Sequence, residues 1–272
     1  ERLAAAGFDL MALPNNHSTD AGPDGLVDTM GALRSAGLLF VGAGTDAANA
    51  YEPTIVTTPA AVIGLLAYDA TGVGTTAGAG PGVAPWDAAT AAAAVRDLRE
   101  RVDVVVVSVH GGTEYLPTRD PGMVEIGEVL ASAGADVVWG HGAHVVQPVT
   151  VTEGDRPTVV ATSLGNFLFD QAGADRTSGY ILELMVNEAG LAAYRVGAVQ
   201  HPERLLEFVE WLPPIGVAGW VDGSWWTLLN EPALGAATTA AVADFRHGDL
   251  IAAAIGDVNG EGASDVIASF RR

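Results

Sequence analysis

The chain of 272 residues contains no cysteine. Disulfide bonds, thiolate metal ligands and thiol nucleophiles are therefore excluded, while the redox compartment stays open. No apolar run reaches the length of a membrane-spanning helix. The first residues, 1–4, have neither an initiator Met nor the pattern of a signal peptide. We therefore expect that a leader was removed or that the sequence is an internal piece of a longer protein.

Positive charge is also scarce. The 13 Lys and Arg residues stand against 33 Asp and Glu residues, which gives a formal net charge of -20. Such a polyanion repels nucleic acid and anionic lipid, so we expect no nucleic-acid partner. An acidic polymer would be repelled as well, unless metal ions or a local basic patch intervene. Hydrophobic residues make up 49% of the chain, which is enough for a sizeable core.

Short apolar runs alternate with helix-like stretches through the first two-thirds of the chain. The strongest strand is 102–109, which is apolar nearly throughout, as expected for a strand covered on both faces. The pattern also predicts strands at 8–13, 39–41, 61–67, 135–139, 149–151, 158–161, 180–186 and 191–196, and helices at 25–36, 87–101 and 123–133. Units of strand, helix and strand come first, and antiparallel strands follow. This order predicts an α/β (α+β) fold, a β-sandwich flanked by helices.

Two segments stand apart from this pattern. Residues 71–84 are rich in Gly, Ala and Pro, which predicts a long surface loop or lid beside the site. Composition changes after about residue 199, where four of the six tryptophans lie. We therefore expect one domain at 1–198, followed at 199–272 by a linker and a small β-rich appendage.

The histidines are the most informative residues. Four of the six, His17, His110, His141 and His144, lie just past a predicted strand. Because the carboxyl ends of neighbouring strands meet in one crevice of an α/β sheet, we expect these imidazoles and the amide of Asn16 to converge. Neutral imidazole is the commonest metal ligand, and adjacent glycines let the backbone approach a bound ion. A single histidine is more often structural, but three such loops together favour a shared site.

Four motifs now resemble those of CapA-type (poly-γ-glutamate capsule synthesis) proteins. Asn15-Asn16-His17, with Asp20 and Gly22, resembles the family's NNHxxDxG signature. Residues 110–115 (HGGTEY) resemble its HWGxEY loop, with Gly111 in place of Trp. Residues 140–148 (GHGAHVVQP) resemble GHHPHVxQP, with Gly142-Ala143 in place of His-Pro, and residues 163–171 (SLGNFLFDQ) resemble SLGNFxFDQ. The similarity runs from about residue 8 to residue 196.

The resemblance implies a fold and a site. The family is similar to calcineurin-like metallophosphoesterases, in which a β-sandwich between helices carries a two-metal centre at its strand ends. Carried over, it implies that Asn16, His110 and His141 bind one divalent metal and His144 binds the other. His17 would be the acid or electrostatic group that faces the leaving oxygen, and Glu114 would orient a ligand histidine or contact substrate. The remaining pocket residues would be Asn15, Asp20, Asn166, Asp170 and Gln171.

Two features of the family's domain are not found before Phe8: an opening strand with an Asp in a GDxM-like motif, and an Asn-Leu-Glu segment. In phosphoesterases the early Asp residues bridge the two metals. We therefore expect the sequence as written to form about half a site and to lack turnover.

The resemblance also implies a role in bacterial capsule or poly-γ-glutamate biosynthesis, at the cell envelope or outside the cell. An anionic polymer or a phosphoester would be the substrate, and membrane components of capsule synthesis would be partners. Metal-dependent hydrolysis or transfer fits a two-metal site. One alternative is a non-catalytic surface scaffold or polymer-attachment component. Another is that the histidine loops are structural and the tail is an adhesion module.

The C-terminal stretch contains an acidic loop. Asp257, Asn259, Glu261 and Asp265 offer oxygen ligands beside two glycines, which suits Ca²⁺. The segment resembles an FG-GAP/VCBS-type repeat, in which such a loop is followed by a strand, here 266–270, and residues 243–252 look like a degenerate copy. Glu261 replaces the usual Asp. A solvated acidic turn is the alternative, and the chain has room for one propeller blade at most.

Overall fold

The computed structural model describes residues 1–153, 156–187, 189–202, 205–215, 218–221, 224–229, 250–256 and 265–270. Its helices are α1 (Arg2–Ala5), α2 (Gly22–Ser35), α3 (Ala47–Tyr51), α4 (Ala88–Arg99) and α5 (Pro121–Ala133). Within these residues, no helix is long and apolar enough to cross a membrane.

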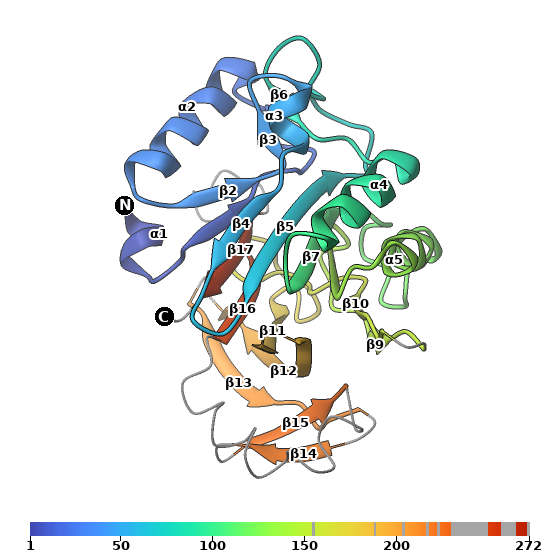
Figure 1. Cartoon of the computed structure of the whole chain (residues 1–272). Coiled ribbons are helices and arrows are strands. Elements are labelled where there is room, and N and C mark those ends of the chain that lie inside the picture. The colour runs from blue at the N-terminus through green and yellow to red at the C-terminus, as the bar shows by residue number, and fades with distance from the viewer. Residues whose placement is uncertain are drawn as a thin grey trace.

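The described strands form two large sheets and one small one (Figure 1). The larger sheet has the order β14-β15-β12-β11-β16-β17-β1-β2, with β13 paired to β12. Its strands are β1 (Leu10–Ala12), β2 (Leu39–Val41), β11 (Ser178–Asn187), β12 (Gly190–Gln200), β13 (Glu207–Trp211), β14 (Ala218–Val221), β15 (Ser224–Leu228), β16 (Leu250–Gly256) and β17 (Asp265–Phe270). The second sheet has the order β4-β5-β7-β8-β10-β9. Its strands are β4 (Thr54–Thr57), β5 (Val62–Asp69), β7 (Val104–His110), β8 (Val137–His141), β9 (Val149–Val151) and β10 (Val159–Ala161), and β3 (Ala43–Gly44) pairs with β6 (Gly82–Val83).

The alternation of side chains along β7 explains how the layers pack. Val104 and Val106 belong to the core between the two large sheets, together with Leu10 of β1 and Leu182 of β11. The intervening valines point to the opposite face, where they pack with side chains of α4 and α5. A third apolar cluster joins α2 to β1 and β2. The order of layers is therefore helix, sheet, sheet, helix, and the predicted α/β sandwich flanked by helices is confirmed (Figure 1).

The helices begin at recognisable caps. The side chain of Asp87 accepts a hydrogen bond from Thr90 N at the start of α4, and Asp120 accepts from Met123 N at the start of α5. Gly134 ends α5 with a positive φ of 106°. The sequence pattern predicted both helices, but it began α5 two residues late because Asp120 was not recognised as its cap.

The strands after residue 198 join the larger sheet. The predicted boundary at 198 lies inside β12, and β16 pairs with β11 while β17 pairs with β1. The strand predicted at 266–270 is present as β17. The division into domains at 1–198 and 199–272 stays a prediction, as does the linker and repeat.

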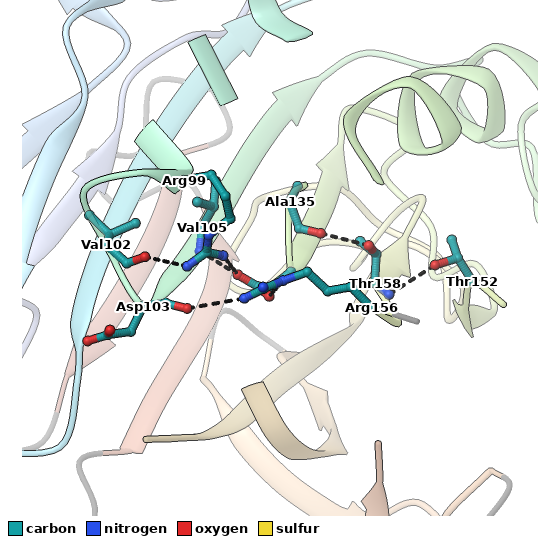
Figure 2. A network of polar contacts seen from close by, with 9 residues as sticks. Arg99, Val102, Asp103, Val105, Ala135, Thr152, Arg156 and Thr158 are labelled. Atoms are coloured by element: carbon teal, nitrogen blue, oxygen red, sulfur yellow. Dashed lines mark hydrogen bonds and ion pairs between the residues drawn. The ribbon is translucent and has the colours of Figure 1, made fainter. Parts of the chain in front are cut away.

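A network of polar contacts joins the amino ends of β7, β8 and β10 (Figure 2). Asp136, which is buried just before β8, accepts hydrogen bonds from Arg99 and from Val105 N, the latter at 2.7 Å. Arg156 Nε donates to the other carboxylate oxygen of Asp136 at 2.8 Å. Thr158 Oγ1 donates to Ala135 O at 2.7 Å. This end of the sheet is stabilised by polar contacts, and the carboxyl end of the same strands carries the histidines.

Candidate functional site

Three parallel strands end side by side at the candidate site. Asp69 of β5 is in register with His110 of β7, and His110 is in register with His141 of β8. The loop that carries Asn15, Asn16 and His17 follows the carboxyl end of β1 in the facing sheet. The predicted convergence of Asn16, His110 and His141 is therefore present.

A chain of hydrogen bonds links four side chains in the site. Asn16 Oδ1 lies 3.0 Å from His110 Nε2, and His110 Nδ1 lies 2.8 Å from His141 Nδ1. The other ring nitrogen of His141 lies 3.1 Å from Ser108 Oγ. An amide oxygen can only accept, so His110 is protonated on Nε2 and its Nδ1 accepts from His141. His141 Nε2 then accepts from the Ser108 hydroxyl, and the direction of every bond is defined.

Burial keeps both of these histidines neutral. It lowers the pKa of His110 to about 3, and the nearby imidazoles of His144 and His17 lower this pKa further. Burial also lowers the pKa of His141 well below its ordinary value, with His110 and His144 as further causes. Neutral imidazoles with available lone pairs are the form that binds metal.

His17 lies at the exposed edge of this cluster. Its Nδ1 is 2.9 Å from Asp20 Oδ2, and its backbone N donates to Asn15 Oδ1 at 2.7 Å. Its imidazole is close enough to lower the pKa of His110. The side chain of His17 is 46% exposed, so it can meet a ligand from solvent. Residues 71–84 lie against this loop, because Thr75 N donates to Thr19 Oγ1 at 3.0 Å, as expected for a loop beside the site.

His144 has a strained backbone conformation. Its φ is 58°, in the left-handed region that residues with a side chain rarely adopt. Its Nδ1 lies 3.0 Å from Asn166 Oδ1, and its ring stacks on Tyr115, whose φ of 61° is unusual as well. Gln171 Nε2 donates to the Tyr115 hydroxyl at 3.2 Å. Asn166 and Gln171 therefore join the predicted site through His144 and Tyr115.

The remaining predicted residues are placed less centrally. Glu114 and Asp170 are exposed, and Glu114 has no hydrogen bond or ion pair within the described residues. Asp257, Asn259 and Glu261 lie outside the described residues, and of Asp265 only the backbone is described, as the first residue of β17. The calcium loop thus stays a prediction.

The donor atoms fit a metal ion at one place. Two ligand nitrogens bound to the same ion at about 2.0–2.1 Å lie roughly 3 Å apart. The two Nδ1 atoms of His110 and His141 are 2.8 Å apart, so an ion can take the place of the proton between them. Asn16 contacts the other nitrogen of His110, which is the position of an orienting partner. No group of three or more His, Asp or Glu side chains among the described residues forms a metal cage.

Two of the three substituted motif positions, Gly111 and Gly142, lie next to each other. A Cβ atom on Gly142, whose φ is 122°, would lie 2.8 Å from Gly111 O. Gly111 stands where the resembling motif has Trp, and Gly142 where it has His. The backbone of Gly111 approaches position 142 more closely than a side chain at position 142 would allow.

Sequence reasoning missed three residues of the site. Ser108 is two positions before His110 and therefore on the same face of β7, which is a signal available from strand periodicity. Asp69 is the last residue of a buried strand, where burial raises the pKa of its carboxyl. Arg176 gave no local signal, because its place over the ring of Tyr115 depends on the fold of a distant loop.

Comparison with known proteins covers the part of the chain that carries these motifs. The family model of the bacterial capsule synthesis protein PGA_cap matches residues 1–171. The chain belongs to this family. The PGA biosynthesis protein CapA of Bacillus subtilis is 30% identical over 204 residues, which are 74% of this chain and 53% of the relative. The capsule biosynthesis protein CapA of Bacillus anthracis is 31% identical over 69% of this chain and 46% of its own length.

A probable polyglutamine synthesis accessory protein of Mycobacterium tuberculosis is 36% identical over 56% of this PGA_cap chain and 43% of the relative. The chain thus spans about half the length of the curated relatives that it matches. Among solved structures, a phosphatase of Mycoplasma pneumoniae aligns with a TM-score of 0.35 and 10% identity, covering 59% of this chain and 56% of that one.

Proposed function

We propose that the chain acts in the synthesis of a bacterial capsule or of poly-γ-glutamate, at the cell envelope or outside the cell. Its membership in the PGA_cap family and the names of its relatives support this role. We further propose that the histidine cluster is a divalent-metal site of the hydrolase type. Its substrate would be an anionic polymer or a phosphoester, and membrane components of capsule synthesis would be its partners.

One observation carries the metal site: two buried neutral imidazoles present Nδ1 atoms to each other at 2.8 Å. In this proposal His110 and His141 bind the ion through Nδ1. Asn16 accepts from Nε2 of His110. The proton on Nδ1 of His141 moves to Nε2 when the ion binds, so this nitrogen then donates to Ser108 Oγ and each ligand ring has an orienting partner. This revises the role of Asn16, which the resemblance implied as a ligand.

The second ion would be held by His144. Asn166 orients it through Nδ1, so Nε2 is the nitrogen that would bind. The chemistry that such ions supply when bound is polarisation of a phosphoryl or carbonyl oxygen and a lowered pKa of water. His17 stays the proposed acid, since it is exposed, close to His110 and paired with Asp20.

A non-catalytic scaffold is the second candidate, and one observation favours it. Both ring nitrogens of His110 and of His141 already have protein partners, so the cluster is satisfied without an ion. A structural polar network of this kind is expected to be complete in itself. Metal binding and turnover separate the two candidates.

The test uses a protein that also carries the family's opening strand with its Asp, purified with Mn²⁺ or Zn²⁺ and dialysed before its metal content is measured. We expect His110→Ala and His141→Ala to lose bound metal and hydrolysis of both p-nitrophenyl phosphate and a γ-linked glutamate oligomer. His17→Gln is the matched variant. It should keep the metal and lose activity by about 10²- to 10⁴-fold, the usual contribution of a general acid.

Two outcomes would count against the proposal in different ways. Metal retention by both alanine variants would place the ion elsewhere and remove the proposed site. Bound metal in the wild type with no turnover of either substrate would leave the scaffold as the better account.

A further inference from the structure

Arg176 lies close to the histidine cluster in a strongly acidic protein. Its guanidinium carbon is 5.3 Å from the centre of the Tyr115 ring, and that ring stacks on His144 with centroids 6.0 Å apart. The backbone oxygen of Arg176 accepts from Asn166 Nδ2 at 2.9 Å, and Asn166 also holds His144. Arg176 is therefore connected to His144 through both its side chain and its backbone.

The guanidinium is available to a ligand. Its side chain is 40% exposed, and within the described residues its only charged partner is Asp175, at 3.9 Å from Nε. Three other arginines are committed elsewhere: Arg99 and Arg156 to Asp136, and Arg195 to Glu183. Arg176 thus keeps donors for a planar oxyanion, which arginine binds with two parallel hydrogen bonds.

The overall charge favours a role for such a residue. A net charge of -20 repels an anionic polymer unless metal ions or local positive charge intervene, and Arg176 supplies local positive charge. The backbone strain at Tyr115 and His144 shows that the surrounding fold fixes these two rings. An arginine held over one of them lies at a fixed distance from the histidine cluster, which is what recognition of a substrate group beside the reacting atom requires.

We propose that Arg176 is the specificity-determining residue that binds a carboxylate of an acidic polymer, holding it against Tyr115 and beside His144. This rests on the proposed function and names how its substrate is selected. The polymer carboxylate nearest to the bond that reacts at the histidine cluster would pair with Arg176. A polymer whose side-chain carboxylates are amidated would lose that pairing and keep its other contacts.

The experiment measures the binding of a fluorescently labelled oligomer of γ-linked glutamate and of the same oligomer with its α-carboxylates amidated. The wild type should prefer the free carboxylates by about 10- to 100-fold, the range expected for a charge-assisted hydrogen bond. Arg176→Gln should lose this preference, while binding of the amidated oligomer stays unchanged. Arg176→Lys should recover part of it, because lysine keeps the charge but not the planar pair of donors.

Arg34→Gln is the matched control. Arg34 lies on α2, and its guanidinium carbon is 4.7 Å from the centre of the Phe40 ring. This variant should behave as the wild type. Full preference for the free oligomer in a folded Arg176→Gln variant would overturn the proposal and leave the proposed function intact. Failure of the wild type to bind either oligomer would instead contradict the proposed function itself. Displacement of the free oligomer by an equal concentration of inorganic phosphate would show a general oxyanion site and overturn the carboxylate assignment.

Discussion

The backbone at Gly142 restricts which residue can occupy this position of the site. Its φ of 122° is accessible to glycine, and a Cβ there would meet backbone atoms of Gly111. We expect Gly142→Ala to lower the free energy of unfolding by at least about 1–3 kcal/mol, the usual cost of such backbone strain. Restoring the motif's histidine at this position should cost as much or more. Urea denaturation monitored by circular dichroism measures the change.

The control for Gly142 is Gly31, which lies inside α2 with open space around its Cβ position. Gly31→Ala should raise the free energy of unfolding by about 0.5–1 kcal/mol, since alanine is the better helix former. Equal effects of the two substitutions would show that the close approach of the two loops is not fixed.

The sequence predicted which residues form the site better than it predicted their roles. The motif spacing identified His110, His141 and Asn16, and the fold brings them together. The spacing could not show that His110 pairs with its neighbours through both nitrogens, because this depends on the register of β7 and β8 and on the facing sheet. The contact between Arg176 and Tyr115 was out of reach for the same reason.

Strand β8 depends on the buried carboxylate that precedes it. The side chain of Asp136 is 3% exposed and accepts from two arginines and a backbone amide. Removing one partner of a buried ion pair leaves uncompensated charge. We expect Asp136→Ala to lower the free energy of unfolding by about 3–5 kcal/mol, as measured by urea denaturation.

The exposed pair between Arg101 and Asp97 provides the comparison. Asp97→Ala should change stability by roughly 0.5 kcal/mol or less, because surface ion pairs contribute little. If Asp136→Ala lost as little stability as Asp97→Ala, Arg99 and Arg156 would be well solvated without Asp136.

At the scale of elements, apolar periodicity predicted the buried strands and three of the short ones, β2, β9 and β10, and it missed others such as β4 and β6. Val104 to Val107 of β7 form a continuous apolar run because both faces are covered, and this signal is strong. Strand β4 is the four-residue run Thr-Ile-Val-Thr, and β6 has two residues within a glycine-rich loop. Pairing with neighbouring strands, which local sequence does not show, defines these elements.

The whole molecule should lose stability as the pH falls, and the buried histidines are one cause. The pKa of His110 is about 3 in the folded chain and near its ordinary 6.5 in the unfolded chain. Between these values the unfolded state binds the extra proton, so stability falls with decreasing pH by up to about 1.4 kcal/mol per pH unit. His141 adds to this slope because its pKa is lowered too.

We expect His110→Gln to flatten the slope between about pH 6.5 and pH 3, relative to the wild type, in urea denaturation with a chelator present. If the slope of the His110 variant matches that of the wild type, His110 does not stay neutral in the folded chain.

The site between the two sheets of the sandwich is the central claim, and a crystal structure of the chain grown with saturating Zn²⁺ tests it most directly. An anomalous difference map should show a peak within about 2.0–2.2 Å of both Nδ1 atoms of His110 and His141. His110 Nε2 should still contact Asn16, and His141 Nε2 should still contact Ser108. Direct contact between the two imidazoles, with no peak at this position, would contradict the account.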